Sequence, residues 1–192
     1  MLSEKFWDAL WKTQETGWDI GYPSPAMCKL IDRIEDKNAA ILIPGCGNAY
    51  EAEYLVSNGF KNITLIDISE TAVQAVKQKF KDNSAVKVLH QDFFKHTGSY
   101  DYILEQTFFC ALDPDLRPDY VNQMHRLLKP DGVLQGLLFG VNFEKAGPPF
   151  GGTSEEYGLL FSEKFEIIEI LITNESIKPR LGTELEFIFR SK

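Results

Sequence analysis

The sequence has little of what defines several large classes of protein. It has only three cysteines, Cys28, Cys46 and Cys110, which are odd in number and lie outside any CxxC spacing. Disulfide frameworks and zinc sites need paired or closely spaced cysteines, so we predict a cytoplasmic protein without disulfides or a bound metal. Lysine and arginine form no cluster, and the net charge is −8. Binding to nucleic acid is therefore not expected, because a phosphate backbone requires a basic surface.

Long apolar runs are also missing from the chain. No run approaches the roughly 20 residues that a membrane-spanning helix needs, so we predict no membrane partner. The N-terminal segment MLSEKFWDALWK is amphipathic and contains acids, which is unlike a signal peptide. What is present is an ordinary globular composition, with 44% hydrophobic and 25% charged residues in a chain of 192. We therefore predict that residues 1–192 form one domain. A monomer is also expected.

Apolar runs and helical patterns alternate along the chain. The predicted strands cover residues 39–44, 63–68, 86–92, 100–106, 133–140, 165–173 and 183–190. Helices are expected after Ser3, from Pro25 to about Asp36, from Tyr50 to about Gly59, after Ser69, after Asp113 and over residues 153–163. Five strand-helix units predict an open α/β sheet, mostly parallel, with helices on both faces. The last two strands have no helix between them and should pair antiparallel.

The helix expected after Asp113 carries a regular apolar pattern. The residues predicted to face the core are Leu116, Tyr120, Met124, Leu127 and Leu128. The sequence Pro130-Asp131-Gly132 then predicts a turn before the strand at 133–140.

Glycines or acids follow each of the first three predicted strands. Gly45 and Gly47 come after the first strand, Asp67 ends the second and Asp92 ends the third. Glycines allow a sharp turn and a close approach to a ligand, and an acid after the second strand can accept both hydroxyls of a ribose. Each residue alone could belong to a tight turn, a helix cap or a loop. Together, in this order, they predict a nucleoside cofactor, with Asp92 near the adenine amine.

The residue three positions after Gly47 distinguishes between two kinds of cofactor. A dinucleotide site requires a third glycine three residues after the second, where it helps to seat a pyrophosphate. This chain has Tyr50 at that position. The tyrosine and the terminal hairpin favour S-adenosylmethionine over NAD, because S-adenosylmethionine has no phosphate.

Several segments resemble the class I methyltransferases and, among these, the thiopurine methyltransferase superfamily. The matching segments are WKTQETGWDIGYPSP (11–25), IPGCGNAYE (43–51), YILEQTFFCALDPDLRPDY (102–120), LLKPDGVL (127–134) and GPPF (147–150). The chain looks most similar to the branch that acts on thiols, thiocyanate and halides. The resemblance implies a Rossmann-like fold with a seven-stranded sheet, S-adenosylmethionine as cofactor, and a small soft nucleophile as methyl acceptor. The segment 178–192 departs from that branch because it lacks a tryptophan-containing ending.

The resemblance also implies roles for individual residues. The cofactor-binding residues would be Trp7, Trp11, Trp18, Gly45, Gly47, Asp67, Ile68, Asp92, Phe93 and Glu105. Residues 1–24 would form a helix and loop over the cofactor, with tryptophan faces near its sulfonium. Glu105, where relatives often carry aspartate, is expected beside the sulfonium and the amino group. The acceptor pocket would contain Trp18, Phe108, Phe109 and Phe150.

Alternative interpretations remain open at this point. Trp7 could simply pack its helix onto the domain, and Phe108 and Phe109 could be core aromatics. We assign no catalytic residue, because a soft anion arrives ionised and needs only to be aligned behind the methyl group. A methyltransferase acting on oxygen, nitrogen or arsenic, an NAD-dependent oxidoreductase and a protein that only binds the cofactor are the other candidates.

Overall fold

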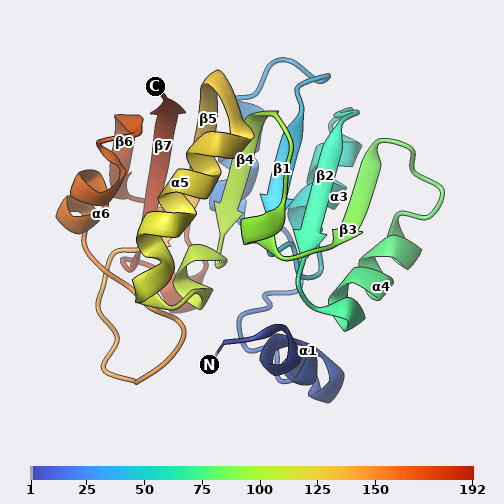
Figure 1. Cartoon of the computed structure of the whole chain (residues 1–192), viewed down its shortest axis with the longest axis horizontal. Helices are drawn as coiled ribbons and strands as arrows, with labels where there is room; N and C mark the ends of the chain where they lie inside the picture. Colours follow the sequence, from blue (N-terminus) through green and yellow to red (C-terminus); the bar gives the residue numbers. More distant parts are fainter. Residues whose placement is uncertain (1) are drawn as a thin grey trace.

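Residues 2–192, which the computed structural model describes, form a seven-stranded sheet with the strand order β3-β2-β1-β4-β5-β7-β6 (Figure 1). The strands are β1 (Ile41–Pro44), β2 (Ile63–Asp67), β3 (Val86–His90), β4 (Tyr100–Gln106), β5 (Leu128–Phe139), β6 (Phe165–Ile172) and β7 (Glu184–Ser191). Only β7 among these runs antiparallel to both of its neighbours. The predicted mostly parallel sheet with a terminal antiparallel hairpin is confirmed.

Six α-helices in the described residues accompany the sheet. They are α1 (Glu4–Thr13), α2 (Pro25–Asp32), α3 (Tyr50–Ser57), α4 (Glu70–Lys79), α5 (Arg117–Leu127) and α6 (Ser154–Phe161). Two of the predicted caps form as expected, because Ser3 Oγ accepts from Phe6 N and Ser69 Oγ accepts from Ala72 N. No helix within residues 2–192 has both the length and the apolar character that crossing a membrane would require.

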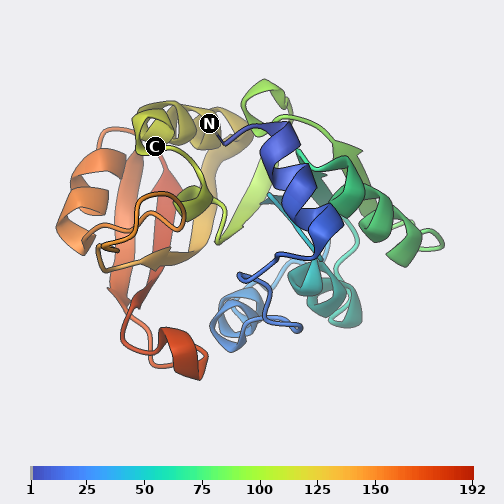
Figure 2. The same ribbon diagram turned by 90° about the horizontal axis from the view of Figure 1, so that it is seen from below.

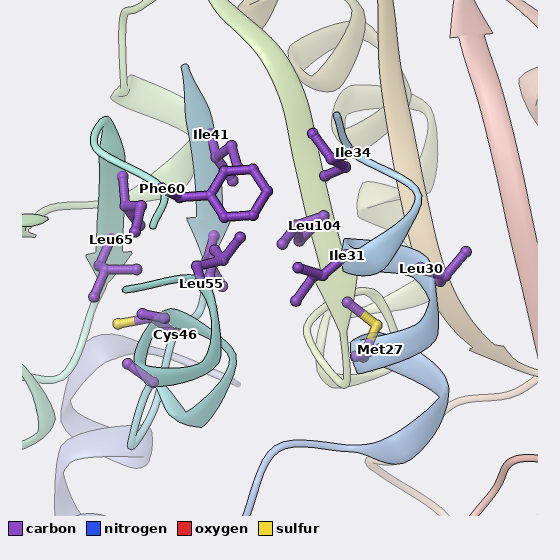
Figure 3. Close-up of a cluster of buried hydrophobic side chains, with 14 of the residues drawn as sticks. Met27, Leu30, Ile31, Ile34, Ile41, Cys46, Leu55, Phe60, Leu65 and Leu104 are labelled. Carbon is purple, nitrogen blue, oxygen red and sulfur yellow. The ribbon is translucent and has the colours of Figure 1, made fainter. Parts of the chain in front are cut away.

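Helices cover both faces of the sheet and enclose two separate cores. In Figure 3, Met27, Leu30 and Ile31 of α2 lie beside the strands, and Leu55 of α3 belongs to the same buried cluster. The opposite face is filled largely by aromatic side chains from α5, α6 and β7, with Tyr120, Phe161, Phe187 and Phe189 essentially inaccessible to water. This two-sided burial explains why the central strands are continuous apolar runs.

The connection between β3 and β4 differs from the predicted strand-helix unit. It contains only a single 3₁₀ turn, η1 (Phe93–Lys95), because nine residues separate the two strands and leave no room for a packed helix. Asp92 caps this turn by accepting a hydrogen bond from Phe94 N at 3.0 Å. The segment therefore stays at the carboxyl end of the sheet instead of covering a face.

Three predicted details around α2, α5 and β5 are wrong. The Pro25 helix ends at Asp32, four residues early. Leu116 is 37% exposed instead of facing the core, because Pro118 is tolerated only in the first turn of a helix and α5 therefore starts at Arg117. Strand β5 begins at Leu128, so the predicted turn becomes an irregularity inside the strand.

Helix α1 does not cover a face of the sheet. It lies across the carboxyl ends of the parallel strands and packs beside α4 (Figures 1 and 2). The strand order reverses between β1 and β4, and open α/β sheets bind ligands at this kind of reversal. The fold thus places α1 over the expected binding position.

Candidate cofactor and acceptor site

A cavity of about 1010 Å³ lies at the carboxyl ends of β1, β2, β3 and β4. Its walls come from the segments that follow these strands, from α1 and its loop, from residues 145–149 and from Arg180 in the β6–β7 connection. That volume is at the upper end for a site that holds one drug-sized ligand, and it suits a cofactor with a second small molecule beside it.

The glycine turn after β1 forms the floor of this cavity. Gly45 and Gly47 have φ angles of 60° and 50°, in the left-handed region that favours glycine. A Cβ on Gly45 would overlap the ring of Phe108, and a Cβ on Gly47 would lie 3.3 Å from Trp11 Cζ2. Both glycines are therefore needed for the backbone geometry and for close contact with two walls of the cavity.

Asp67, at the end of β2, lies in the cavity wall and is only 8% exposed. Its Oδ2 accepts from Gly47 N at 3.0 Å, and its Oδ1 accepts from Ser69 N at 2.8 Å. Burial raises the pKa of Asp67, and these backbone donors act in the opposite direction. Each oxygen keeps a lone pair that can accept from a ligand hydroxyl.

Three more predicted residues lie along the same wall. Ile68, Asp92 and Phe93 all line the cavity. The Phe93 ring is buried and meets the Phe108 ring edge to face, with their centroids 5.1 Å apart. An acid and an apolar surface are thus adjacent beyond Asp67, as an adenine ring would require.

The three tryptophans come together above this wall. Trp7 and Trp11 of α1 each meet Trp18 edge to face, with centroid separations of 5.6 and 5.9 Å. All three line the cavity, and none of the residues of α1 is fully buried. The apolar side of α1 therefore faces the cavity and not a protein core.

Acids that sequence reasoning did not single out hold this N-terminal segment in place. Asp8 accepts from Ser69 Oγ and Thr71 N at the start of α4, at 2.9 and 2.8 Å, and pairs with Lys12. Its pKa is lowered, chiefly by Lys12. Asp19 accepts from the side chains of Asn48 and Tyr50 beside the glycine turn.

Arg180 is a further cavity residue that the sequence analysis did not identify. Its Nη2 donates to Trp18 O at 2.8 Å, and its Nη1 lies 3.4 Å from Glu184 Oε1. It joins the C-terminal hairpin to the loop after α1 across 162 positions of sequence. In the sequence its segment, residues 178–192, stood out only as a departure from the branch.

Glu105 is the main correction among the predicted site residues. It is completely buried and does not line the cavity. Its Oε1 accepts from Phe108 N and Phe109 N, both at 2.9 Å, and its Oε2 accepts from Tyr120 OH. Burial raises the pKa of Glu105 to about 7. The side chain is turned away from the cofactor position because the chain folds back over it after β4.

Of the four predicted acceptor-pocket residues, two line the cavity and two do not. Trp18 and Phe108 line the cavity, whereas Phe109 is fully buried among Tyr120, Tyr157 and Phe161. Phe150 is half-buried and outside the cavity wall, although its N–H donates to Cys110 O at 2.7 Å. The neighbouring Pro148 and Pro149 line the cavity in its place.

The fold and the cavity define a class. A glycine turn after β1, a buried acid at the end of β2 and the single antiparallel strand β7 are the arrangement of class I S-adenosylmethionine-dependent methyltransferases, and these residues fit that cofactor. The crystal structure of *Burkholderia thailandensis* 1,6-didemethyltoxoflavin-N1-methyltransferase with bound S-adenosylhomocysteine is similar at a TM-score of 0.76 and 18% identity. This match covers 98% of the present chain and 87% of that chain.

Sequence comparison identifies the family within this class. Residues 2–183 match the thiopurine S-methyltransferase family, and the chain belongs to it. The probable thiol methyltransferase 2 of *Arabidopsis thaliana* is 34% identical over 184 residues, covering 93% of this chain and 81% of the relative. The thiocyanate methyltransferase 1 of *Brassica oleracea* is 29% identical over 189 residues, covering 95% and 83%. The protein is therefore an S-adenosylmethionine-dependent methyltransferase of this family.

Proposed function

We propose that the enzyme transfers a methyl group from S-adenosylmethionine to a small soft nucleophile, namely a thiol, hydrosulfide, thiocyanate or halide. The observation that carries this proposal is the composition of the cavity wall beyond Phe108. It combines aromatic and apolar groups with two cations, Lys145 and Arg180. No histidine occurs among the described residues that line the cavity. The cavity also contains the carboxylates of Glu15, Asp19 and Glu51, of which Asp19 accepts from the side chains of Asn48 and Tyr50 and Glu51 accepts from Ser24 N. Such a wall suits an acceptor that arrives as an anion and needs no general base.

The cofactor would be held along the first half of the cavity. Asp67 would accept from the ribose hydroxyls, Asp92 would meet the adenine amine, and Ile68 and Phe93 would contact the adenine ring. The glycine turn would hold the methionine part, and Trp7, Trp11 and Trp18 would cover the molecule as part of residues 2–24. When bound, S-adenosylmethionine supplies a methyl group that its sulfonium already activates.

The chain's own contribution at the acceptor end is alignment and exclusion of water. Phe108 and Trp18 border the cavity there, and Arg180 offers a cation that can attract an anion. Cys110 also lines the wall, but burial raises the pKa of its thiol to about 12. The thiol therefore stays protonated at neutral pH and cannot serve as a base or a competing nucleophile.

A turnover assay with a panel of acceptors tests this proposal. Release of S-adenosylhomocysteine would be followed with hydrosulfide, thiocyanate, iodide, an aromatic thiol and a catechol, and with Asp67→Asn as the matched control. We expect saturable release with at least one sulfur or halide acceptor and none with the catechol. Turnover of the catechol alone, or cofactor binding without turnover of any acceptor, would contradict the proposal.

A further inference from the structure

The buried carboxyl group of Glu105 accepts three hydrogen bonds from the protein itself. Two of the donors, the N–H groups of Phe108 and Phe109, belong to the segment 107–112 that follows β4, and the third is the hydroxyl of Tyr120 on α5. None of the three carries a charge. Backbone N–H groups can only donate, whereas the Tyr120 hydroxyl can also accept, so either the ionised or the protonated carboxyl group can satisfy all three groups at once.

The segment that Glu105 holds makes up part of the acceptor end of the cavity. Thr107, Phe108, Cys110, Ala111 and Leu112 all line the cavity. Thr107 has a φ of 58°, a left-handed conformation that a β-branched residue rarely adopts and that needs support from its surroundings. The two N–H groups that donate to Glu105 Oε1 follow directly after this strained residue.

Tyr120 connects the Glu105 hydrogen bonds to the part of the cavity that the cofactor would occupy. Its ring lies 5.7 Å from the Phe93 ring and 6.1 Å from the Phe108 ring, measured between centroids. The Phe108 ring in turn packs against Gly45, where a Cβ would lie only 2.9 Å from Phe108 Cγ. The position of segment 107–112 thus decides where the Phe108 ring meets the glycine turn.

We propose that Glu105 is a positioning residue that, through its hydrogen bonds to Phe108 N, Phe109 N and the Tyr120 hydroxyl, holds segment 107–112 in the shape that forms the acceptor end of the cavity. It would touch neither the cofactor nor the acceptor, and would act through the backbone of Phe108 and Phe109. The inference rests on the proposed function only for the identity of the acceptor used in the kinetic test.

The surroundings of Glu105 set the direction of its pH response. The titratable groups that face it are Tyr120 from α5 and Cys110 from segment 107–112, both of them neutral at pH 7. Strand β5 places Gly136, which has no side chain, opposite it. Because no cation offsets burial, the pKa of Glu105 is raised to about 7. Protonated Glu105 keeps Oε1 for the two N–H groups and can donate its own proton to the Tyr120 hydroxyl, so the holding interaction persists as the pH falls below 7.

Three variants separate positioning from a general structural role. Glu105→Ala leaves all three donors without a partner. Glu105→Gln keeps an oxygen for the two N–H groups and turns its amide toward the Tyr120 hydroxyl, which can accept. Tyr120→Phe removes one donor and preserves the aromatic packing. At pH 8 we expect the KM for thiocyanate to rise about 30-fold in Glu105→Ala and by less than about threefold in Glu105→Gln.

Thiocyanate is the chosen acceptor because it does not itself titrate between pH 5 and 9. In the wild type and in Glu105→Gln its KM should change by less than about threefold across this range. In Tyr120→Phe the pKa of Glu105 should move higher, because a donor to the ionised form is lost. The Kd for S-adenosylhomocysteine should change much less than the acceptor KM. Equal changes in both constants, or a Gln variant as impaired as the Ala variant, would overturn the proposal.

A second measurement does not depend on the acceptor. In ¹⁵N–¹H spectra the amides of Phe108 and Phe109 should titrate with a midpoint near pH 7 in the wild type and show no such titration in Glu105→Gln. This readout applies even if no acceptor on the panel is turned over, and even if Glu105→Ala does not fold. Wild-type Phe108 and Phe109 amides that exchange with solvent as fast as unprotected amides would refute the proposal independently of the enzyme's activity, whereas a midpoint away from pH 7 would correct only the pKa of Glu105.

Discussion

Two buried carboxylates at the ends of parallel strands support opposite ends of the same cavity. Asp67 ends β2 and Glu105 lies one residue before the end of β4, and both accept hydrogen bonds from backbone N–H groups just beyond their strands. Asp67 lines the cavity, whereas Glu105 lies behind its wall. An acid after a strand therefore indicates a following loop whose N–H groups need a hydrogen-bond acceptor. Only sometimes does it indicate a residue that binds a ligand.

The two acids differ in which donors face each oxygen. Both oxygens of Asp67 face backbone N–H groups. In Glu105 one oxygen takes both N–H groups, and the other faces a hydroxyl that can also accept. An amide can therefore replace the carboxylate of Glu105, whereas at Asp67 it would bring its NH₂ group against another donor.

The sharpest test of this comparison is the pair Asp67→Asn and Glu105→Gln. We expect Asp67→Asn to weaken binding of S-adenosylhomocysteine about 100-fold, because it disturbs the glycine turn as well as the proposed ribose contact. Glu105→Gln should change the same Kd by less than about threefold. Isothermal titration calorimetry measures both values. Similar losses in the two variants would mean that both acids face the cofactor.

The pH dependence of stability provides a second test. The pKa of Glu105 is about 7 in the folded protein, against an ordinary value of 4.5. Between these values the folded state binds more protons than the unfolded chain, so this group lowers the free energy of unfolding as the pH rises. Urea unfolding at pH 5 and pH 7 should show that the wild type loses about 2 kcal/mol more than Glu105→Gln over this interval. Equal pH dependence in the two proteins would indicate that Glu105 ionises normally.

A smaller effect should reveal the contact between the two ends of the cavity. Gly45→Ala and Gly59→Ala both place a Cβ at a positive φ, but only at Gly45 would it meet another residue, Phe108. We expect Gly45→Ala to be less stable than Gly59→Ala by about 1 kcal/mol or more. Adding Phe108→Ala should recover part of this loss in a double-mutant cycle. Additive effects of the two substitutions would show that the contact contributes nothing.

The sequence by itself determined the sheet, the glycine turn and the acids that follow its strands. These features depend on local patterns, namely apolar runs, caps and turn residues, which the chain carries within a few neighbouring positions. The same local signals placed Gly45, Gly47, Asp67 and Asp92 at one end of the sheet, where parallel strands bring their carboxyl ends together.

Only the tertiary structure decided the direction in which several side chains point. Glu105 turns from the cavity because Tyr120, 15 residues later, returns on α5 to meet it. Phe108 and Phe109 are adjacent, yet one lines the cavity and the other enters the core. Asp8 and Arg180 find partners 61 and 162 positions away. Such contacts depend on the packing of distant elements, and no local pattern in the chain records them.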